Sequence, residues 1–439
     1  MNPKFVEEFE KEKFADLSPI QKAVYEPLSA GENVIGYAPT GSGKTLAYAM
    51  PLLETLLPQD GTQLLVLVPS QELAVQVNNV MGRFASLLGM KSIAVIGGAN
   101  VKRQYEKLKK HPEIVVGTPG RILDVINERK LKMHKLTSCV VDEADQMLAD
   151  DASMAACREI VGHAKADVQL SFFSATDSAK LNDVHHWFGI EPKVIDVRQI
   201  DDTQGHVVHY LVESPERKRV EMLRKLANLD DFAGLVFFDS TTTVKDAAEK
   251  LAFQHVAVGE LSSGQSSQKR KQALADLRKR KIRLLLTTDV AARGLDIAQL
   301  PAVVNFDIPR DLTTYIHRSG RTGRMGAQGA VINLGNEHDL RQFKQLVGNE
   351  GYDLQTGYVY QHQLVTDLKS AQALNKQENK PKKKKKTKAQ VKQIAAAEKK
   401  QNQKVKHKKN RKRDRKNKGK PKSKKKMDGS SDSIWQCVP

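Results

Sequence analysis

The sequence has few cysteines and no long apolar run. Its 439 residues include three cysteines, Cys139, Cys157 and Cys437, whose spacing matches neither a disulfide framework nor a metal site. We therefore expect a reducing, intracellular environment and no zinc site. No stretch approaches the roughly 18 apolar residues that a membrane span needs, and no signal-like segment opens the chain. The sequence predicts a soluble, cytoplasmic protein with no membrane partner.

Positive charge is unevenly distributed along the chain. The sequence contains 71 Lys or Arg against 51 Asp or Glu, a formal net charge of +20. Residues 375–427 alone hold 26 cationic and three acidic side chains, which leaves 45 cationic and 46 acidic side chains in residues 1–374. The body is therefore near neutral and the basicity belongs to the tail. Such a Lys-rich tract cannot bury a hydrophobic core, so we expect it to be disordered.

Apolar runs alternate with helical patterns in two series. The first series comprises residues 34–37, 64–68, 92–96, 114–116, 138–141 and 169–173, and the second comprises 234–239, 257–261, 283–287, 302–307 and 330–334. Continuous Val, Ile and Leu runs separated by helices indicate parallel sheets covered on both faces. The sequence predicts an α/β fold with domains at 1–191 and 206–367, a linker at 192–205 and the tail at 368–439.

The segment APTGSGKT lies between a strand-like run and a helical pattern. Backbone N–H groups of such a loop, together with the positive end of the following helix, attract phosphate oxygens. Lys44 can reach the β- and γ-phosphates, and the Thr45 hydroxyl suits Mg²⁺. We predict that the segment binds a nucleotide through Ala38, Pro39, Thr40, Gly41, Ser42, Gly43, Lys44 and Thr45. The alternative, a chance glycine-serine turn, is disfavoured by the strand–loop–helix context.

An acidic quartet, DEAD at residues 142–145, follows the predicted strand at 138–141. Ligands gather at this end of the strands in a parallel sheet. Asp142 is expected to hold Mg²⁺ through its waters, and Glu143 to accept a proton from the attacking water. Four such residues alone more often belong to a solvated loop or a helix N-terminus. Their position after an apolar run and downstream of the nucleotide loop favours a catalytic role instead.

Further segments follow in a fixed order. They are LSPIQ at 17–21 after Phe14, PSQELAVQ at 69–76, GG at 97–98, TPGR at 118–121, SAT at 174–176, residues 234–240 and 268–271, TD at 288–289, AARGLD at 291–296 and HRSGRTGR at 317–324. With the nucleotide loop and the acidic quartet, this set resembles the DEAD-box family of ATP-dependent RNA helicases. It is similar to the smaller bacterial members that carry a Lys-rich C-terminal tail. The resemblance implies two tandem RecA-like domains with ATP between them.

The resemblance also implies roles at the nucleotide. Phe14 packs on the adenine, the Gln21 amide pairs with the base edge, and Asp296 contacts the ribose. From the second domain, Arg321 and Arg324 reach the phosphates as arginine fingers and complete a catalytic set with Lys44 and Glu143. The cofactors implied are ATP and Mg²⁺.

RNA contacts and coupling are implied in the same way. Ser174, Thr176 and His317 couple hydrolysis to unwinding. The RNA-contacting residues are Pro69, Ser70, Gly97, Gly98, Thr118, Pro119, Gly120, Arg121, Gln268, Lys271 and Thr288. Four positions depart from the family pattern: Gln71 and Lys271 stand where Arg is common, Leu17 replaces Pro, and Ser263 replaces His. Two of these exchanges weaken cationic contacts, so we expect the core to hold RNA loosely.

The sequence therefore predicts a monomeric RNA helicase that hydrolyses ATP to ADP and phosphate and unwinds or remodels short RNA duplexes. Its partners are RNA and a ribosomal precursor or decay complex, in ribosome assembly or RNA turnover. The alternatives are an RNA chaperone or assembly factor that acts through its tail, with the ATPase timing release, and a DNA helicase. The tail is expected to tether RNA, with a targeting signal or solubility device as alternatives. The basic stretch at 101–110 is expected to be a solvated face rather than an RNA groove.

Overall fold

The computed structural model describes residues 1–12, 16–98, 100–203, 205–262, 265–292, 300–360 and 362–367. Phe14, Ser263, Asp296 and the predicted tail at 368–439 lie outside these residues. Within the described ranges, no helix is both long enough and apolar enough to cross a membrane.

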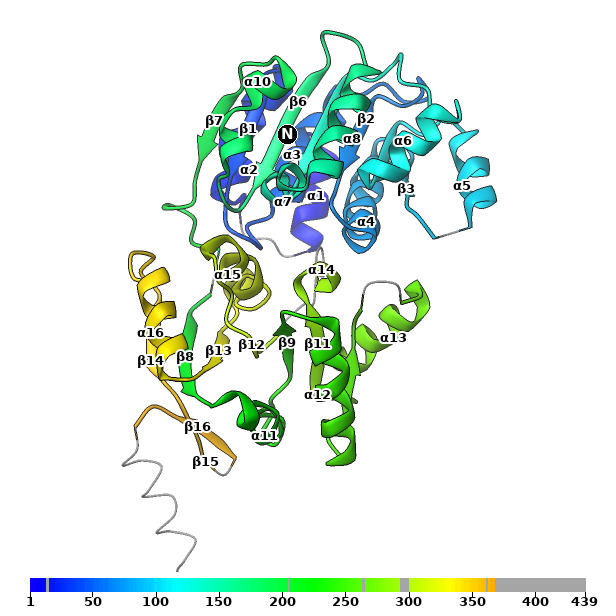
Figure 1. The fold of residues 1–439 in the computed structure, drawn as a ribbon. Helices are drawn as coiled ribbons and strands as arrows, with labels where there is room; N and C mark the ends of the chain where they lie inside the picture. The colour runs from blue at the N-terminus through cyan, green and yellow to red at the C-terminus, as the bar shows by residue number, and fades with distance from the viewer. Residues whose placement is uncertain are drawn as a thin grey trace, which may run out of the picture. The chain divides into compact units, whose positions relative to one another are not determined.

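The first lobe, residues 1–196, is built on a parallel sheet of seven strands in the order β3-β4-β2-β5-β6-β1-β7 (Figure 1). The strands are β1 Val34–Tyr37, β2 Leu64–Leu67, β3 Ser92–Val95, β4 Ile114–Gly117, β5 Ser138–Asp142, β6 Gln169–Ser174 and β7 Lys193–Asp196. Each of the six predicted strands of the first series is present, within one or two residues of its predicted ends.

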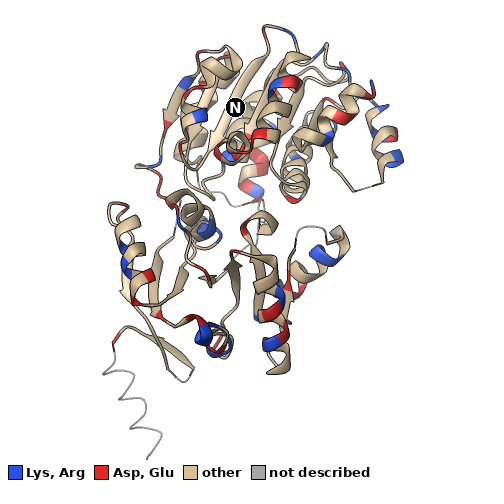
Figure 2. Cartoon of the chain, in the orientation of Figure 1, with Lys and Arg blue, Asp and Glu red and all other residues tan. Residues whose placement is uncertain are grey.

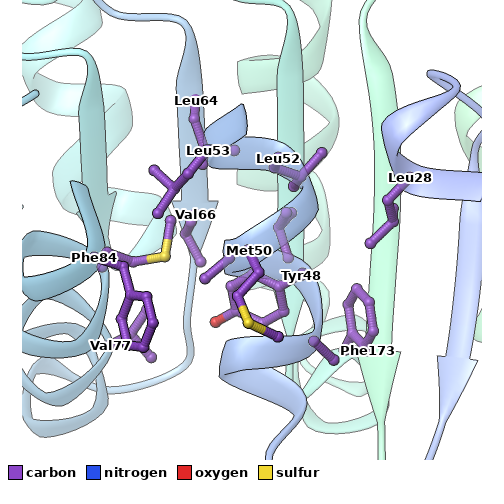
Figure 3. Packing of buried hydrophobic residues seen from close by; sticks show 14 of the residues in the cluster. Leu28, Tyr48, Met50, Leu52, Leu53, Leu64, Val66, Val77, Phe84 and Phe173 are labelled. Atoms are coloured by element: carbon purple, nitrogen blue, oxygen red, sulfur yellow. The ribbon is translucent and has the colours of Figure 1, made fainter. Parts of the chain in front are cut away.

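Helices cover both faces of this sheet. They are α1 Pro3–Lys11, α2 Pro19–Ser29, α3 Lys44–Thr55, α4 Gln71–Leu87, α5 Val101–Leu108, α6 Pro119–Asn127, α7 Ala144–Ala149, α8 Asp151–Gly162, α9 Ala179–Asn182 and α10 Val184–Phe188. Side chains alternate along each strand, so Val34 packs in the core under α1–α4 and Ile35 in the core under α5–α10. Figure 3 shows the first core, where Tyr48 of α3 lies beside Phe173 of β6 with ring centroids 5.1 Å apart.

The second lobe, residues 207–365, repeats this architecture. Its sheet has the order β10-β11-β9-β12-β13-β8-β14, and the seven strands are parallel. The strands are β8 Val207–Glu213, β9 Gly234–Phe238, β10 Val258–Glu260, β11 Leu284–Thr288, β12 Ala302–Asn305, β13 Gly329–Gly335 and β14 Asp353–Thr356. The helices are α11 Glu216–Ala227, α12 Thr241–Phe253, α13 Ser267–Arg278, α14 Asp289–Ala292, α15 Leu312–Ser319, η1 Arg324–Gly326 and α16 Glu337–Leu346. An antiparallel hairpin, β15 Tyr358–Tyr360 and β16 Gln363–Val365, follows the sheet. Two parallel α/β sheets confirm the predicted fold class.

The stretch expected to be a linker, residues 192–205, begins with a strand. Lys193–Asp196 form β7, which pairs in parallel with β1 from Val34 opposite Lys193 to Tyr37 opposite Asp196. Because three of its four residues are exposed, β7 lacks the apolar run by which the other strands were recognised. The chain between the two sheets is therefore residues 197–206.

Candidate functional site

The predicted site segments of the first lobe lie at one edge of its sheet. In a parallel sheet all carboxyl ends share an edge, and the segments lie at the ends of β1 to β6, except for LSPIQ, which opens α2 before β1. The order β3-β4-β2-β5-β6-β1-β7 divides them into two groups. The RNA-directed segments follow the neighbouring strands β3, β4 and β2. The acidic quartet, the coupling segment SAT and the nucleotide loop lie at the ends of the neighbouring strands β5, β6 and β1. The strand order therefore separates the residues predicted to bind RNA from those predicted to bind the nucleotide along this edge of the sheet.

The nucleotide loop is a tight turn that leads from β1 into α3. Gly41 and Gly43 have φ of 88° and 83°, a backbone region that favours glycine. The Lys44 ammonium lies inside the turn and donates hydrogen bonds to the carbonyl oxygens of Ala38 and Pro39 at 2.7 and 2.9 Å. Burial lowers the pKa of Lys44, which nearby Asp142 and Glu143 partly counteract. The loop therefore has the geometry of a phosphate-binding turn with a charged group at its centre.

Gln21 braces this turn from α2. Its Nε2 donates to the Gly43 carbonyl at 3.2 Å, and its Oε1 accepts from the Ser18 backbone N–H at 3.0 Å. Both polar ends of the amide are thus engaged with the protein in this structure. An adenine edge that pairs with Gln21 has to compete with these two contacts.

Asp142 is a buried carboxylate at the end of β5. The Tyr48 hydroxyl donates to its Oδ2 at 2.9 Å, and the Glu143 backbone N–H donates to its Oδ1 at 2.9 Å. Burial, followed by the negative charge of Glu143, raises the pKa of Asp142 to about 6, although Lys44 and Tyr48 oppose the shift. Tyr48 was missed from the sequence because it looks like one more core residue of α3.

Glu143 turns the chain out of β5 into α7. Its φ of 51° is unusual for a residue with a side chain and is held by the surrounding strand and helix. Its Oε2 is buried and has no hydrogen-bond partner among the described residues, while Oε1 lies 3.7 Å from Nη2 of Arg321. An unoccupied acceptor oxygen in a cavity is a suitable group to take a proton from water.

The two lobes meet around a cavity of about 470 Å³. Its lining includes Thr40, Gly41 and residues 43–45 of the nucleotide loop, the acids Asp142 and Glu143, and Arg321 and Arg324 from the second lobe. The Arg324 guanidinium Nε donates to the Gly320 carbonyl at 2.8 Å. A Cβ placed on Gly41 would lie 3.1 Å from Cγ of Arg324, so this arginine packs directly on the nucleotide loop. The structure thus brings together Lys44, Glu143, Arg321 and Arg324.

The Gly320 backbone of the second lobe packs closely against Thr40 of the nucleotide loop. A Cβ at this position would lie 1.7 Å from the Thr40 hydroxyl oxygen. Only a residue without a side chain fits here, because both groups belong to folded segments with little freedom to move.

One carboxylate oxygen of Asp145 also connects the two lobes. Oδ2 of Asp145 accepts from the Thr176 hydroxyl and lies 2.6 Å from Nε2 of His317. Burial raises the pKa of Asp145, but the hydrogen bond and charge of His317 outweigh it and hold the pKa below its usual range. The Ser174 hydroxyl donates to the Thr176 carbonyl at 2.5 Å. The three predicted coupling residues therefore form one network, with Asp145 as a member that was quoted in the sequence but given no role.

The predicted RNA segments begin helices. Ser70 accepts from the Leu73 N–H at 3.2 Å as the N-cap of α4, and Pro69 precedes it. Thr118 precedes α6, whose first turn contains Pro119, Gly120 and Arg121. Helix N-termini at a sheet edge suit phosphate groups. Gly97 and Gly98 follow β3, and a Cβ on Gly97 would lie 3.3 Å from Nε2 of Gln71.

In the second lobe the structure separates the predicted RNA residues. Thr288 ends β11 and is buried, whereas Gln268 and Lys271 are exposed on α13. The buried cation of this helix is Arg270, which was not singled out. Its Nε donates to Oε1 of Glu72 in the first lobe at 2.6 Å, and its other nitrogens donate to the carbonyls of Ser262 and Ala291.

The inward position of Arg270 has a sequence signal. It lies three, four and seven residues before Ala273, Leu274 and Leu277, the apolar stripe of α13. A cation on such a stripe is buried only when it is paired, which here requires Glu72. Phe14 and Asp296, the remaining predicted nucleotide contacts, lie outside the described residues.

Comparisons with known proteins agree with this arrangement. Residues 18–184 match the model of the DEAD/DEAH box helicase domain, and residues 218–326 match the helicase conserved C-terminal domain. The chain is 40% identical over 342 residues to the probable ATP-dependent RNA helicase YfmL of Bacillus subtilis, covering 78% of this chain and 90% of that protein. The chain belongs to the DEAD-box family of ATP-dependent RNA helicases. The family resemblance recognised from the ordered segments is thereby confirmed, and with it an enzyme with RNA-dependent ATPase activity.

Two further relatives extend the comparison. The DEAD-box ATP-dependent RNA helicase CshC of Bacillus cereus is 36% identical over 352 residues, covering 79% of this chain and 90% of that protein. Dbp5 of S. cerevisiae, bound to RNA and ADP BeF3, has a TM-score of 0.72 at 26% identity and covers 81% of this chain and 93% of its own. This DEAD-box chain therefore shares its family's tandem RecA-like fold and nucleotide binding.

The residues of this DEAD-box site fit a bound Mg²⁺. Mg²⁺ is usually held by one or two carboxylates together with waters and substrate phosphates. Asp142 is a buried carboxylate whose negative charge is destabilised by burial and by Glu143, so a cation here would relieve both effects. Asp142 and the Thr45 hydroxyl would hold the ion, which would neutralise charge on the phosphate oxygens.

Lowering the pH through about 6 is expected to weaken Mg²⁺ binding at Asp142 and so to raise the Mg²⁺ concentration that ATP hydrolysis requires. The folded-state pKa of about 6 lies above the ordinary 3.8, so this carboxyl holds a proton below pH 6 and releases it above. Metal binding needs the deprotonated form. The Mg²⁺ concentration for half-maximal ATPase activity should rise about tenfold for each pH unit below 6 and level off above 7. Asp142→Asn is the control, because it keeps the titration of ATP itself; an equal pH dependence in this variant would contradict the assignment.

Proposed function

We propose that this chain hydrolyses ATP to ADP and phosphate, with Mg²⁺, and uses the cycle to unwind or remodel short RNA duplexes. The observation that carries the proposal is the meeting of Lys44 and Glu143 from one lobe with Arg321 and Arg324 from the other around a single cavity. In this arrangement Glu143 activates the attacking water and the two guanidinium groups stabilise charge on the transferring phosphoryl group.

Closure of the two lobes couples the ligands. The catalytic set is complete only when the lobes are together, and RNA-directed segments stand on both lobes. ATP and RNA each favour closure, so each raises the affinity for the other by the same factor. Asp145, Thr176 and His317 link the two lobes between these sites. Closure also bends one RNA strand, and this bend separates a short duplex locally.

The direct test compares single-stranded RNA and DNA as activators of ATP hydrolysis at equal nucleotide concentration. We expect strong stimulation by RNA and little by DNA. Equal stimulation by both would favour a DNA helicase instead, and no stimulation by either would reject the proposal.

The process served is ribosome assembly or RNA turnover, in the cytoplasm, with the protein acting as a monomer on a ribosomal precursor or a decay complex. A long Lys-rich segment suits RNAs that expose many phosphates. Crosslinking followed by sequencing of the bound RNA tests the process, and light scattering of the free protein tests the monomer.

Removing the segment after Leu374 is expected to weaken RNA binding and to flatten its salt dependence. If about ten of its cations meet single-stranded phosphates, they contribute about 7 units to the slope of log K against log salt concentration. ATPase activity at saturating RNA should change little, because the nucleotide site lies within residues 1–374. RNA titrations at several salt concentrations provide the measurement, and an unchanged slope would reject RNA tethering by this segment.

A further inference from the structure

Cationic side chains of α5 and of the turn after α6 gather around one tyrosine on the flank of the first lobe. Lys102, Lys109 and Lys130 line a hollow of about 230 Å³ together with Tyr105 and Glu106. Figure 2 shows basic residues along α5, which lies beside α6 in this lobe. The hollow has a net charge of +2 from these lining residues.

Tyr105 fixes the positions of two cations. The guanidinium carbon of Arg121 lies 5.7 Å and Nζ of Lys130 lies 5.8 Å from its ring centroid, within the range of cation–π attraction. The Tyr105 hydroxyl donates to Glu128 and lies 3.5 Å from Nη2 of Arg121. Cations held in place by a ring lose less conformational freedom on binding than lysines extended into water.

The charge of this cluster is only partly neutralised. Lys109 pairs with Glu106 of the same helix at 2.9 Å, but Lys102 and Lys130 form no ion pair with any residue that the structure describes. Nε of Arg121 is buried and has no hydrogen-bond partner among the same residues. Lys102 and Lys130 therefore offer unpaired positive charge beside Arg121, whose guanidinium is mostly buried and pairs with Asp124 at 3.4 Å.

The cluster continues the predicted RNA segments. Arg121 ends the TPGR segment at the start of α6, and α5 begins three residues after Gly98. Lys102 lies in the first turn of α5 and Tyr105 in the next turn. An RNA strand that runs from Gly98 and Arg121 along α5 therefore passes Lys102 before it reaches the hollow at Tyr105. A purely solvated helix, as expected from the sequence, does not require a lysine and an arginine of a separate segment to lie over the ring of one of its residues.

We propose that α5 and the turn after α6 form an additional phosphate-binding surface for single-stranded RNA, continuing the RNA path from Arg121 along the flank of the first lobe. The inference rests on the proposed helicase function and extends the RNA site beyond the segments that the family resemblance assigns. Lys102, Lys109 and Lys130 contact successive phosphates, and Tyr105 positions Lys130 and Arg121.

The test replaces Lys102, Lys109 and Lys130 together by Ala in the full chain. Three lost single-strand contacts should lower the slope of log K against log salt concentration by about 2 units and weaken binding of a long single-stranded RNA about tenfold at moderate salt. ATPase activity at saturating RNA should stay within twofold of the unaltered chain. The RNA is extended stepwise at its 5′ or its 3′ end, and the affinity gained on extension at one end should be lost in the variant.

The matched control replaces Lys135, Lys165 and Lys193 by Ala. These exposed lysines also lie in the first lobe, but Lys135 and Lys165 precede strands and Lys193 begins one, so all three lie at the opposite edge of the sheet. This variant loses the same charge and should keep the dependence of affinity on RNA length. Equal losses in both triple variants, or none in the first, would overturn the proposal. Failure of RNA to stimulate the ATPase of the unaltered chain would instead reject the helicase function itself.

Tyr105 supplies an independent check. Tyr105→Phe keeps the ring beneath the two cations, so RNA affinity should stay near that of the unaltered chain. Tyr105→Ala removes the ring and should weaken long RNA binding about threefold, through the cations it positions. Equal affinities of the Phe and Ala variants would show that the ring does not position the cations.

Discussion

Replacing Glu143 by Gln is expected to lower ATP turnover by about 10²–10⁴-fold, the usual contribution of a positioned general base. The amide has nearly the same size and preserves the turn at φ 51°, but it does not accept a proton at neutral pH. Nucleotide and RNA binding should remain, because Lys44 and the loop around it are untouched. Single-turnover ATP hydrolysis, compared with the affinity for ATP and RNA, provides the measurement.

The same variant separates the helicase from an RNA chaperone. A helicase that needs turnover loses strand separation under continuous ATP supply, whereas a chaperone that acts through its basic segment keeps it. Glu26→Gln, an exposed exchange on α2, controls for the loss of one negative charge and should leave both activities unchanged. Strand separation by Glu143→Gln at the rate of the unaltered chain would reject the enzyme mechanism.

Replacing Arg321 or Arg324 by Ala is expected to lower ATP turnover by about 10³–10⁵-fold, as for other arginine fingers. Both side chains line the nucleotide cavity from the second lobe, and Arg321 lies 3.7 Å from Glu143. Their charge acts on the phosphoryl group only when the lobes are together, so kcat should fall much more than the affinity for ATP. Steady-state kinetics at saturating RNA separate these two quantities.

Lysine substitution refines this prediction. Arg321→Lys retains the charge but loses the planar fork that can contact two oxygens at once, so most of the activity should still be lost. Arg341→Ala is the matched control, because Arg341 is an exposed arginine of the same lobe, paired with Glu337 at 2.8 Å on α16. Turnover within twofold of the unaltered chain for Arg321→Ala and Arg324→Ala would exclude both as fingers.

Much of the fold could be predicted because buried parallel strands are continuous apolar runs. Leu64–Leu67 and Leu284–Leu286 are fully buried, and both were recognised from composition alone. The strands β7, β8 and β14 were not recognised. Polar residues of the edge strands β7 and β14 resemble a loop because one side of each strand faces solvent, and β8 is only partly buried. Only pairing with β1 identifies Lys193–Asp196 as a strand, and pairing is a tertiary property.

The candidate site was predictable as an ordered set of segments but not as a network. The loop before α3, the acids at the end of β5 and the arginines after α15 follow local patterns, and the structure brings them to one cavity. The hydrogen bond from Arg270 to Glu72 joins residues that are 198 positions apart in the sequence. The family pattern points to position 271 instead, where the structure has an exposed lysine next to the buried Arg270. Likewise, the hydrogen bond from Tyr48 to Asp142 depends on how α3 packs on the sheet, which no local pattern encodes.

The close fit of Gly320 against Thr40 has a mechanical consequence. There is no space between the Gly320 backbone and the Thr40 hydroxyl for even one added methyl group. A side chain at position 320 would therefore keep the two lobes from closing fully. In such a partly closed arrangement of the lobes, neither Arg321 nor Arg324 would reach the reacting phosphate. We therefore expect the two lobes to populate an open and a fully closed arrangement, with no active arrangement between them.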